Sequence, residues 1–150
     1  DGGEVVGYVA PTMSRRDELH GVVRTALERD GWRITHDPLL LQGGSHNLYV
    51  DLGAEQILAA ERGEQRIAVE VKGFTGRSEI TELERALGQY VLYETLLRKS
   101  HPGRSLVLAV PASVYESLLS SELGRTLQEA FPLRLMVFDP IAEEVRRWVW

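Results

Sequence analysis

The sequence contains no cysteine among its 150 residues. This absence excludes disulfides, zinc sites built on thiolates, and cysteine nucleophiles. A bound metal ion would have to be held by oxygen or imidazole ligands, which favours hard cations such as Mg²⁺ or Mn²⁺.

Long apolar runs are also missing. No stretch approaches the roughly 20 residues of a helical membrane span, and nothing at the start resembles a signal peptide. The hydrophobic fraction of 43% and the charged fraction of 26% are those of an ordinary globular protein. We therefore expect a cytoplasmic protein with no membrane association.

The third absence is a run of basic residues. The formal net charge is −5, and the arginines are scattered along the chain. Affinity for DNA depends on clustered Lys and Arg that neutralise phosphates, so the isolated domain is expected to bind DNA weakly. A local basic groove formed by the fold is not excluded.

The chain length suits one domain, and the pattern of elements predicts an α/β fold with a mixed central sheet flanked by helices. Residues 1–13 show no periodicity and are expected to be an N-terminal tail, with a single domain over residues 14–150. The turn at 42–45 is interpreted as a hairpin connection, and residues 54–62 as either a short helix or an extended segment. The other expected elements are a helix from Ser14 to Gly31, strands at 32–36, 47–52 and 67–72, a long helix capped by Ser78 or Thr81, a strand at 105–110, helical segments at 112–119 and 122–130, and strands at 133–138 and 144–150.

The strand at 67–72 is the centre of the functional argument. Its sequence, IAVEVK, alternates, so its three branched aliphatic residues share one face while Glu70 and Lys72 share the other. In a sheet covered by helices on both faces, a carboxylate and an ammonium are costly to bury without a partner or a ligand. On an exposed strand the same two charges would have no special meaning.

Asp51 lies on the polar side of the strand expected just before. If that strand is a neighbour of 67–72, the carboxylates of Asp51 and Glu70 form a site for Mg²⁺ or Mn²⁺. Lys72 can then orient an attacking water or offset charge on phosphorus. Alone, an aspartate followed by Glu-x-Lys is weak evidence, because this pattern also occurs in many exposed strands.

This arrangement resembles the core of the PD-(D/E)xK nuclease superfamily, an αβββαβ unit. The resemblance implies a restriction-endonuclease-like fold with Asp51, Glu70 and Lys72 as catalytic residues, although Val50 stands where the family often has proline. Gln89 and Tyr93 fit the Q-x-x-x-Y motif of RecB-like members, and their spacing puts them on one helix face. We expect both to face a cleft and to contact nucleic acid while Leu87 and Val91 are buried; an ordinary amphipathic helix is the alternative.

At closer range, almost the whole chain after residue 14 resembles the XisH family, the fdxN element excision controlling factors. The matching stretches are Asp17-x-x-His20, Asp30-Gly31-Trp32, Ile34-Thr35-His36-Asp37-Pro38, Leu48-Tyr49-Val50-Asp51-Leu52-Gly53-Ala54-Glu55, Ala59-Ala60-Glu61-Arg62, Val69-Glu70-Val71-Lys72, Ala86-Leu87-Gly88-Gln89-Tyr90 and Ala109-Val110-Pro111. The resemblance implies a nuclease-like protein in programmed excision of a cyanobacterial DNA element, alongside a site-specific recombinase and a second small factor, XisI. It does not imply proven cleavage. His20 matches a family position and either contacts the nucleic acid or metal site, or is a hydrogen-bonded histidine that holds the helix to the sheet.

Three functional hypotheses remain open. The first is a Mg²⁺-dependent endonuclease acting on DNA, the second is a non-catalytic accessory factor that binds DNA or a partner protein, and the third is one subunit of a toxin-like pair with XisI. We expect XisI or a second copy of the chain to complete the DNA-binding surface. Trp148 and Trp150 share one face of the last expected strand and are the predicted contact surface, unless both fold under a helix.

Overall fold

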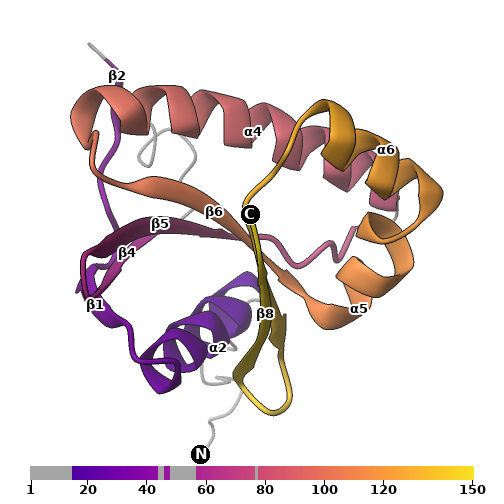
Figure 1. The fold of residues 1–150 in the computed structure, drawn as a ribbon, viewed down its shortest axis with the longest axis horizontal. Coiled ribbons are helices and arrows are strands. Elements are labelled where there is room, and N and C mark those ends of the chain that lie inside the picture. The colour runs from indigo at the N-terminus through magenta and orange to yellow at the C-terminus, as the bar shows by residue number, and fades with distance from the viewer. Residues whose placement is uncertain (1–14, 44–45, 48–56, 77) are drawn as a thin grey trace, which may run out of the picture.

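The computed structural model describes residues 15–43, 46–47, 57–76 and 78–150, and these form a sheet enclosed between helices (Figure 1). The predicted tail and the predicted strand at 47–52, with Asp51, lie almost wholly outside these residues. The elements are α2 (Arg15–Arg29), β1 (Arg33–His36), β2 (Gln42–Gly43), β3 (His46–Asn47), β4 (Ile57–Arg62), β5 (Gln65–Val71), α4 (Glu79–Ser100), β6 (Ser105–Pro111), α5 (Ala112–Val114), the π-helix η1 (Tyr115–Leu119), α6 (Glu122–Ala130), β7 (Leu135–Asp139) and β8 (Glu144–Val149).

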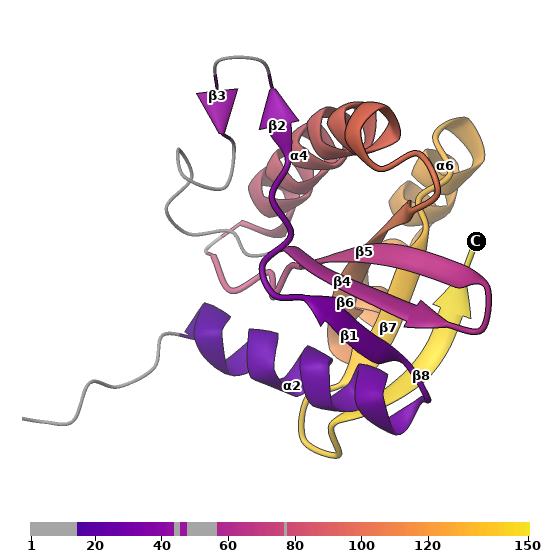
Figure 2. The ribbon, with the colours of Figure 1, turned by 90° about the vertical axis from the view of Figure 1, so that its left-hand side faces the viewer.

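The main sheet has six strands in the order β1-β4-β5-β6-β7-β8. β5, β6 and β7 run parallel to one another. The pairs β1–β4, β4–β5 and β7–β8 are antiparallel. The predicted fold class is therefore confirmed as mixed α/β, consistent with a nuclease-like core. β2 and β3 form a separate hairpin that stands away from the main sheet (Figure 2), as expected for the turn between them.

Two hydrophobic clusters cover the two faces of the sheet. α2 lies on one face, where Ile67, Val69 and Val71 are buried, while α4 and α6 lie on the other (Figure 1). Ala68 belongs to the cluster on the α4 face. The alternation predicted for β5 is thus confirmed, because strand geometry sends successive side chains to opposite faces. β6 is buried along almost its whole length, as its nearly all-apolar sequence predicts.

The segment before the central strand is extended. β4 begins at Ile57 and pairs antiparallel with β5, with Ile57 opposite Glu70 and Arg62 opposite Gln65. Of the two interpretations left open for residues 54–62, the extended one therefore holds from Ile57 onward. On the β4 side of the sheet, the residue paired with Glu70 is Ile57. Residues 48–52 of the predicted strand lie outside the described residues, so their position relative to Glu70 stays a prediction.

The rotation of α4 about its axis was predicted wrongly at Val91 and Tyr93, whereas Leu87 is partly buried against the core. Its buried residues are Leu83, Ala86, Tyr90, Tyr93 and Leu97, whereas Val91 is 46% exposed. The buried residues follow one another at intervals of 3 or 4, as on one face of a helix. Two of them are tyrosines, whereas the prediction put aliphatic residues on this face. Tyrosine can lie in a core when its hydroxyl finds a partner, so composition alone did not identify the buried face.

The start of α4 distinguishes the two expected caps. The Ser78 hydroxyl accepts a hydrogen bond from the Thr81 backbone N–H at 3.1 Å, which makes Ser78 the N-cap. Of the two caps predicted from the sequence, Ser78 is therefore correct and Thr81 is not. No helix in the described part of the chain has both the length and the apolar composition needed to cross a membrane.

β8 is an edge strand, as predicted, but its two tryptophans have different environments. Trp148 packs against the cluster under α2, and its indole centroid lies 5.4 Å from that of Trp32. Trp150 is 57% exposed, with its centroid 5.2 Å from that of Trp148. One tryptophan thus folds under a helix and the other remains at the surface.

Asp139, in the turn between β7 and β8, is expected to make folding stability depend on acidic pH. Backbone N–H groups of Ala142 and Ile141 and the Arg146 guanidinium lower the pKa of its carboxyl from 3.8 to about 2, the Ala142 bond contributing most. Because the folded-state pKa is depressed, this stabilisation is complete above the unfolded value and is lost as pH falls from 3.8 through about 2.

The measurement is a set of thermal melts of the wild type and Asp139→Asn between about pH 2 and pH 6. Asparagine keeps an oxygen acceptor but does not titrate, so the variant should lose less Tm than the wild type across the acidic window. Glu144→Gln, at an exposed site in the same hairpin, is the control and should follow the wild type. Identical pH profiles for wild type and Asp139→Asn would contradict the assignment.

Candidate functional site

Glu70 is a fully buried carboxylate on the central strand. It lies opposite Ile57 of β4 and Leu108 of β6, on the sheet face covered by α4. No other charged residue in the described part of the chain is fully buried. A carboxylate in such surroundings costs several kcal/mol unless a cation and hydrogen bonds compensate for its lost hydration.

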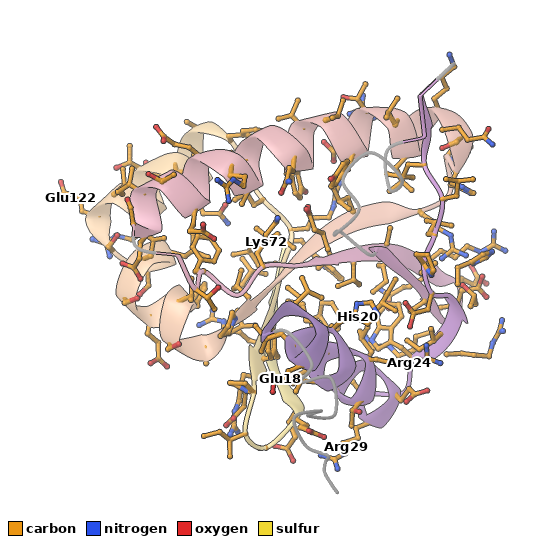
Figure 3. The ribbon with its side chains drawn as sticks, turned by 180° about the vertical axis from the view of Figure 1, so that it is seen from behind. Glu18, His20, Arg24, Arg29, Lys72 and Glu122 are labelled. Carbon is orange, nitrogen blue, oxygen red and sulfur yellow. The ribbon has the colours of Figure 1, made fainter. Side chains whose placement is uncertain are left out.

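Lys72 supplies a cation next to this carboxylate. Its Nζ lies 3.6 Å from Oε2 of Glu70, and its side chain is only 11% exposed. The backbone N–H of Lys72 donates to the Ala109 carbonyl at 2.9 Å, which extends the ladder between β5 and β6 by one residue. Glu70 and Lys72, two of the three groups predicted to converge, therefore lie together at the C-terminal end of β5, with Lys72 between α2 and α4 (Figure 3). The third group, Asp51, lies outside the described residues.

The loop after Lys72 is held closely against α2. A Cβ at Gly73 would lie 2.5 Å from Cδ1 of Leu19, so a larger residue at this position would require the Leu19 side chain to shift. Phe74 follows with φ at 54°, in the left-handed region that non-glycine residues rarely occupy. Gly73 packs against Leu19 of α2, and Phe74 packs against the cluster on the α4 face, so these contacts determine the direction of the chain after Lys72. Residues in strained backbone conformations, such as Phe74, cluster at functional sites.

Gln89 and Tyr93 lie on the inner side of α4, facing the same side of the sheet as Glu70. Tyr93 is fully buried within the cluster under α4, so the expectation that it faces an open cleft is wrong. Oε1 of Gln89 is buried and has no hydrogen-bond partner among the residues that the structure describes. Their contact with nucleic acid remains a prediction. For such a contact, the nucleic acid would have to reach the polar groups of Gln89 and Tyr93 that are buried beneath α4.

Tyr90 was missed by the sequence argument. Its hydroxyl donates to the Leu106 carbonyl at 3.4 Å and accepts from the Arg134 backbone N–H at 3.3 Å, while burial raises the pKa of the phenol. It therefore ties α4 to β6 and to the start of β7. The only signal in the sequence was its position one turn from Ala86 and two turns from Leu83 on the buried stripe.

His20 makes the contacts of a structural histidine. Its Nε2 lies 2.8 Å from Oδ1 of Asp37, and Nη1 of Arg24 donates to Oδ2 of the same carboxylate at 2.6 Å. His20 and Arg24 are on α2 (Figure 3), whereas Asp37 follows β1, so the three residues join that helix to the sheet. This matches the second interpretation given for His20, and a role in nucleic acid binding remains a prediction.

Arg104 is a second residue that the sequence did not single out. Its guanidinium donates to the carbonyls of Ala60 and Ile67, to the Thr35 hydroxyl and to the Glu61 carboxylate at 3.1–3.3 Å. Burial lowers the pKa of this guanidinium, and Glu61 partly offsets that effect. Arg104 thereby links β1, β4 and β5 before β6 begins, and it stabilises the sheet edge far from Glu70.

The predicted metal site depends on a residue that the structure does not describe. Among the described residues no group of three His, Asp or Glu side chains is placed to hold a metal ion. Glu70 supplies one buried carboxylate, and a divalent cation would need oxygen ligands in addition to it. Asp51 is the predicted second carboxylate, and its position lies outside the described residues.

A mixed α/β sheet with a buried acid and a lysine at the end of its central strand is consistent with the class of nuclease-like α/β proteins. The family model described as XisH protein matches residues 13–146, and the chain belongs to the XisH family.

Two solved structures are similar over nearly the whole chain. An XisH family protein from Nostoc punctiforme is 37% identical with a TM-score of 0.81, covering 89% of this chain and 100% of the other. An fdxN element excision controlling factor protein from Anabaena variabilis is 39% identical with a TM-score of 0.81, covering 89% and 99%. A comparison with curated proteins found no match.

Proposed function

We propose that this protein controls the excision of a DNA element and that its Glu70–Lys72 pair is part of a metal-dependent phosphodiesterase site. The observation that carries the proposal is a fully buried carboxylate with an ammonium 3.6 Å away, both at the end of the central strand. A purely apolar residue would cost less at this place, so retention of both charges favours a chemical role. Similarity to an excision controlling factor supports DNA as the substrate.

The proposed roles follow from the side-chain chemistry. Glu70 and Asp51 provide hard oxygen ligands for Mg²⁺ or Mn²⁺. When bound, such an ion polarises the phosphate and lowers the pKa of a coordinated water. Lys72 orients the attacking water and offsets the negative charge that develops on the phosphate oxygens. Gln89 and Tyr93 would position the nucleic acid after an opening between α4 and the sheet.

A non-catalytic factor is the second candidate, and the net charge of −5 favours it. In this case Glu70 and Lys72 form a structural ion pair, and DNA is bound with the help of another chain. We propose XisI or a second copy of this protein as that partner, with the exposed edge of β8 as the contact. An edge strand with unpaired backbone groups is a common site of strand addition.

Binding of Mn²⁺ is the first test. We expect the full chain to bind Mn²⁺ in electron paramagnetic resonance or calorimetric titrations, and Glu70→Gln to weaken the affinity by at least about tenfold because a hard anionic ligand is replaced by a neutral amide. Asp51→Asn should have a similar effect. Glu84→Gln, at an exposed position of α4, is the control and should bind as the wild type does.

Two results would remove the catalytic proposal. One is an absence of Mn²⁺ binding to the wild type, and the other is an affinity that Glu70→Gln leaves unchanged. Either would favour the non-catalytic factor, whose interaction with DNA does not require the ion. Light scattering and DNA mobility shifts with and without XisI then measure whether a partner completes the binding surface.

A further inference from the structure

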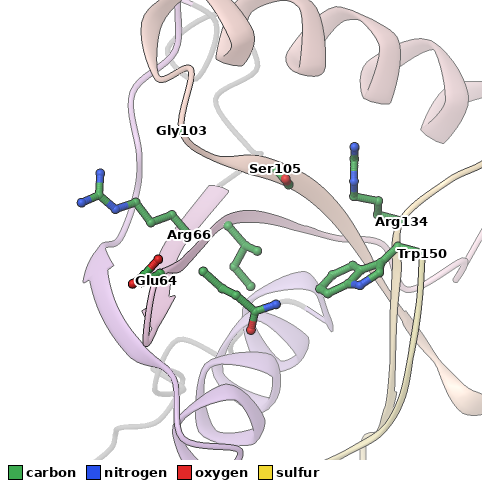
Figure 4. Close-up of a pocket in the computed structure, with 8 residues that line it drawn as sticks. Glu64, Arg66, Gly103, Ser105, Arg134 and Trp150 are labelled. Atoms are coloured by element: carbon green, nitrogen blue, oxygen red, sulfur yellow. The ribbon is translucent and has the colours of Figure 1, made fainter.

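A cavity of about 460 Å³ lies at the opposite end of the sheet from Glu70 and Lys72. It is formed where β5 and β6 begin and where the chain leaves β8 (Figure 4). Its volume is within the range of small-ligand sites, roughly 300–1,000 Å³. The residues that line it are Glu64, Gln65, Arg66, Ile67, Gly103, Ser105, Arg134 and Trp150.

Trp150 provides a flat aromatic wall. The residue is 57% exposed and its ring extends into the cavity (Figure 4), while the ring of Trp148 lies next to it at a centroid distance of 5.2 Å. Trp148 is held in turn by Trp32 and by a hydrogen bond from its Nε1 to Oδ2 of Asp30 at 3.1 Å. An exposed indole backed by two further indoles is a stacking platform whose position is determined by the core.

Two arginines line the cavity together with Trp150. Arg66 lies across the cavity from Trp150, and its side chain extends away from the indole (Figure 4). The backbone of Arg134 lies near Trp150, and its side chain points away from the indole toward α4 (Figure 4). Arg66 pairs with Glu61 at 3.8 Å and Arg134 with Glu94 at 3.0 Å.

Both arginines can exchange these partners for a ligand. Their side chains are 59% and 40% exposed, and ion pairs at such exposure contribute little to stability. A phosphate accepts bidentate hydrogen bonds from guanidinium groups. Ser105 adds a hydroxyl between them, while Glu64 at the rim can accept hydrogen bonds from amino groups but repels a simple anion.

We infer that this cavity binds a nucleotide unit, with the base stacked on Trp150 and the phosphate held by Arg66 and Arg134. The combination of a flat aromatic wall, two cations and one acidic acceptor fits a ligand that has an aromatic ring, amino donors and a phosphate. The source is either a free nucleotide or one base of a single-stranded nucleic acid. This inference concerns a different end of the sheet and does not depend on the proposed cleavage site.

The test uses the full chain in buffer containing EDTA, so that the proposed metal site plays no part. Calorimetry and tryptophan fluorescence measure the binding of adenosine monophosphate, of adenosine, and of a single-stranded oligonucleotide of about ten nucleotides. Adenosine monophosphate should quench the fluorescence and bind at least about fivefold more tightly than adenosine, because only it carries the phosphate.

Variants separate stacking from phosphate contact. Trp150→Ala should weaken binding of the nucleotide by at least about tenfold, whereas Trp150→Phe should retain most of the affinity because it keeps an aromatic face. Arg66→Ala and Arg134→Ala should weaken binding of adenosine monophosphate but leave that of adenosine unchanged. Arg98→Ala, at an exposed position near the end of α4, is the matched control and should alter neither.

Each outcome decides the inference. If adenosine monophosphate binds at least as tightly as the oligonucleotide, the ligand is a free nucleotide. If the oligonucleotide binds more tightly and Trp150→Ala abolishes this binding, the ligand is a single-stranded nucleic acid. The inference is overturned if neither probe binds at about 5 mM nucleotide and 0.1 mM oligonucleotide, concentrations at which even weak sites fill. The inference is also overturned if Trp150→Ala binds both probes as tightly as the wild type does. A Trp150→Ala variant that loses self-association but keeps its affinity for the probes would assign the ring to a protein contact instead.

Discussion

Lys72→Ala is expected to lower metal-dependent cleavage of DNA by about a hundredfold or more, the usual loss when a group that stabilises developing charge is removed. In the wild type the ammonium lies 3.6 Å from the Glu70 carboxylate and is mostly shielded from water. An electrostatic contribution in such a site is far stronger than at an exposed surface. The measurement is the rate of plasmid nicking by the full chain under single-turnover conditions with Mg²⁺ or Mn²⁺.

Two further variants make this result interpretable. Lys99→Ala removes a lysine from the exposed last turn of α4 and should leave the rate unchanged. Because Lys72→Ala leaves a buried carboxylate with less compensation, its Tm must be measured as well. The double variant Glu70→Gln, Lys72→Met removes both charges with similar volumes and should fold but not cleave. An unchanged rate in either Lys72 variant would show that the activity comes from another site or a contaminant.

Arg104→Ala is expected to destabilise the fold by about 3 kcal/mol, since it removes several hydrogen bonds of a mostly buried charged group at once. Its side chain is 8% exposed and bonds to acceptors from three strands. The free energy of unfolding is measured in urea, and the corresponding loss of Tm is about 6–12 °C for a chain of this size.

Arg98→Ala is the matched control for this prediction. Arg98 also pairs with a glutamate, at 3.6 Å, but its side chain is 71% exposed. Its loss should cost less than about 0.5 kcal/mol, as is typical of surface pairs. Equal effects of the two substitutions would mean that burial and the number of acceptors do not determine what these arginines contribute.

The central part of the candidate site could be predicted from the sequence alone. Alternation in the segment IAVEVK places Glu70 and Lys72 on one side of a strand, because the side-chain period of a strand is set by its own backbone. The mixed α/β class, the hairpin near residue 43 and the buried strand after Ser105 follow from the same kind of local signal. Each of these features depends on residues only a few positions apart.

Only the tertiary structure decided which helix face is buried and which partner each charge has. Tyr93, rather than Val91, lies on the buried side of α4, in one hydrophobic cluster with Leu106 and Leu108 of β6. The hydrogen bond from Trp148 to Asp30 spans 118 residues, and that from Arg104 to Thr35 spans 69. Such contacts carry no periodic signal, because they form only when distant strands and helices pack together. The sequence by itself therefore determined the class of fold and the pairing of an acid with a lysine on β5, whereas packing determined the burial of that pair, the orientation of α4 and the exposure of Trp150.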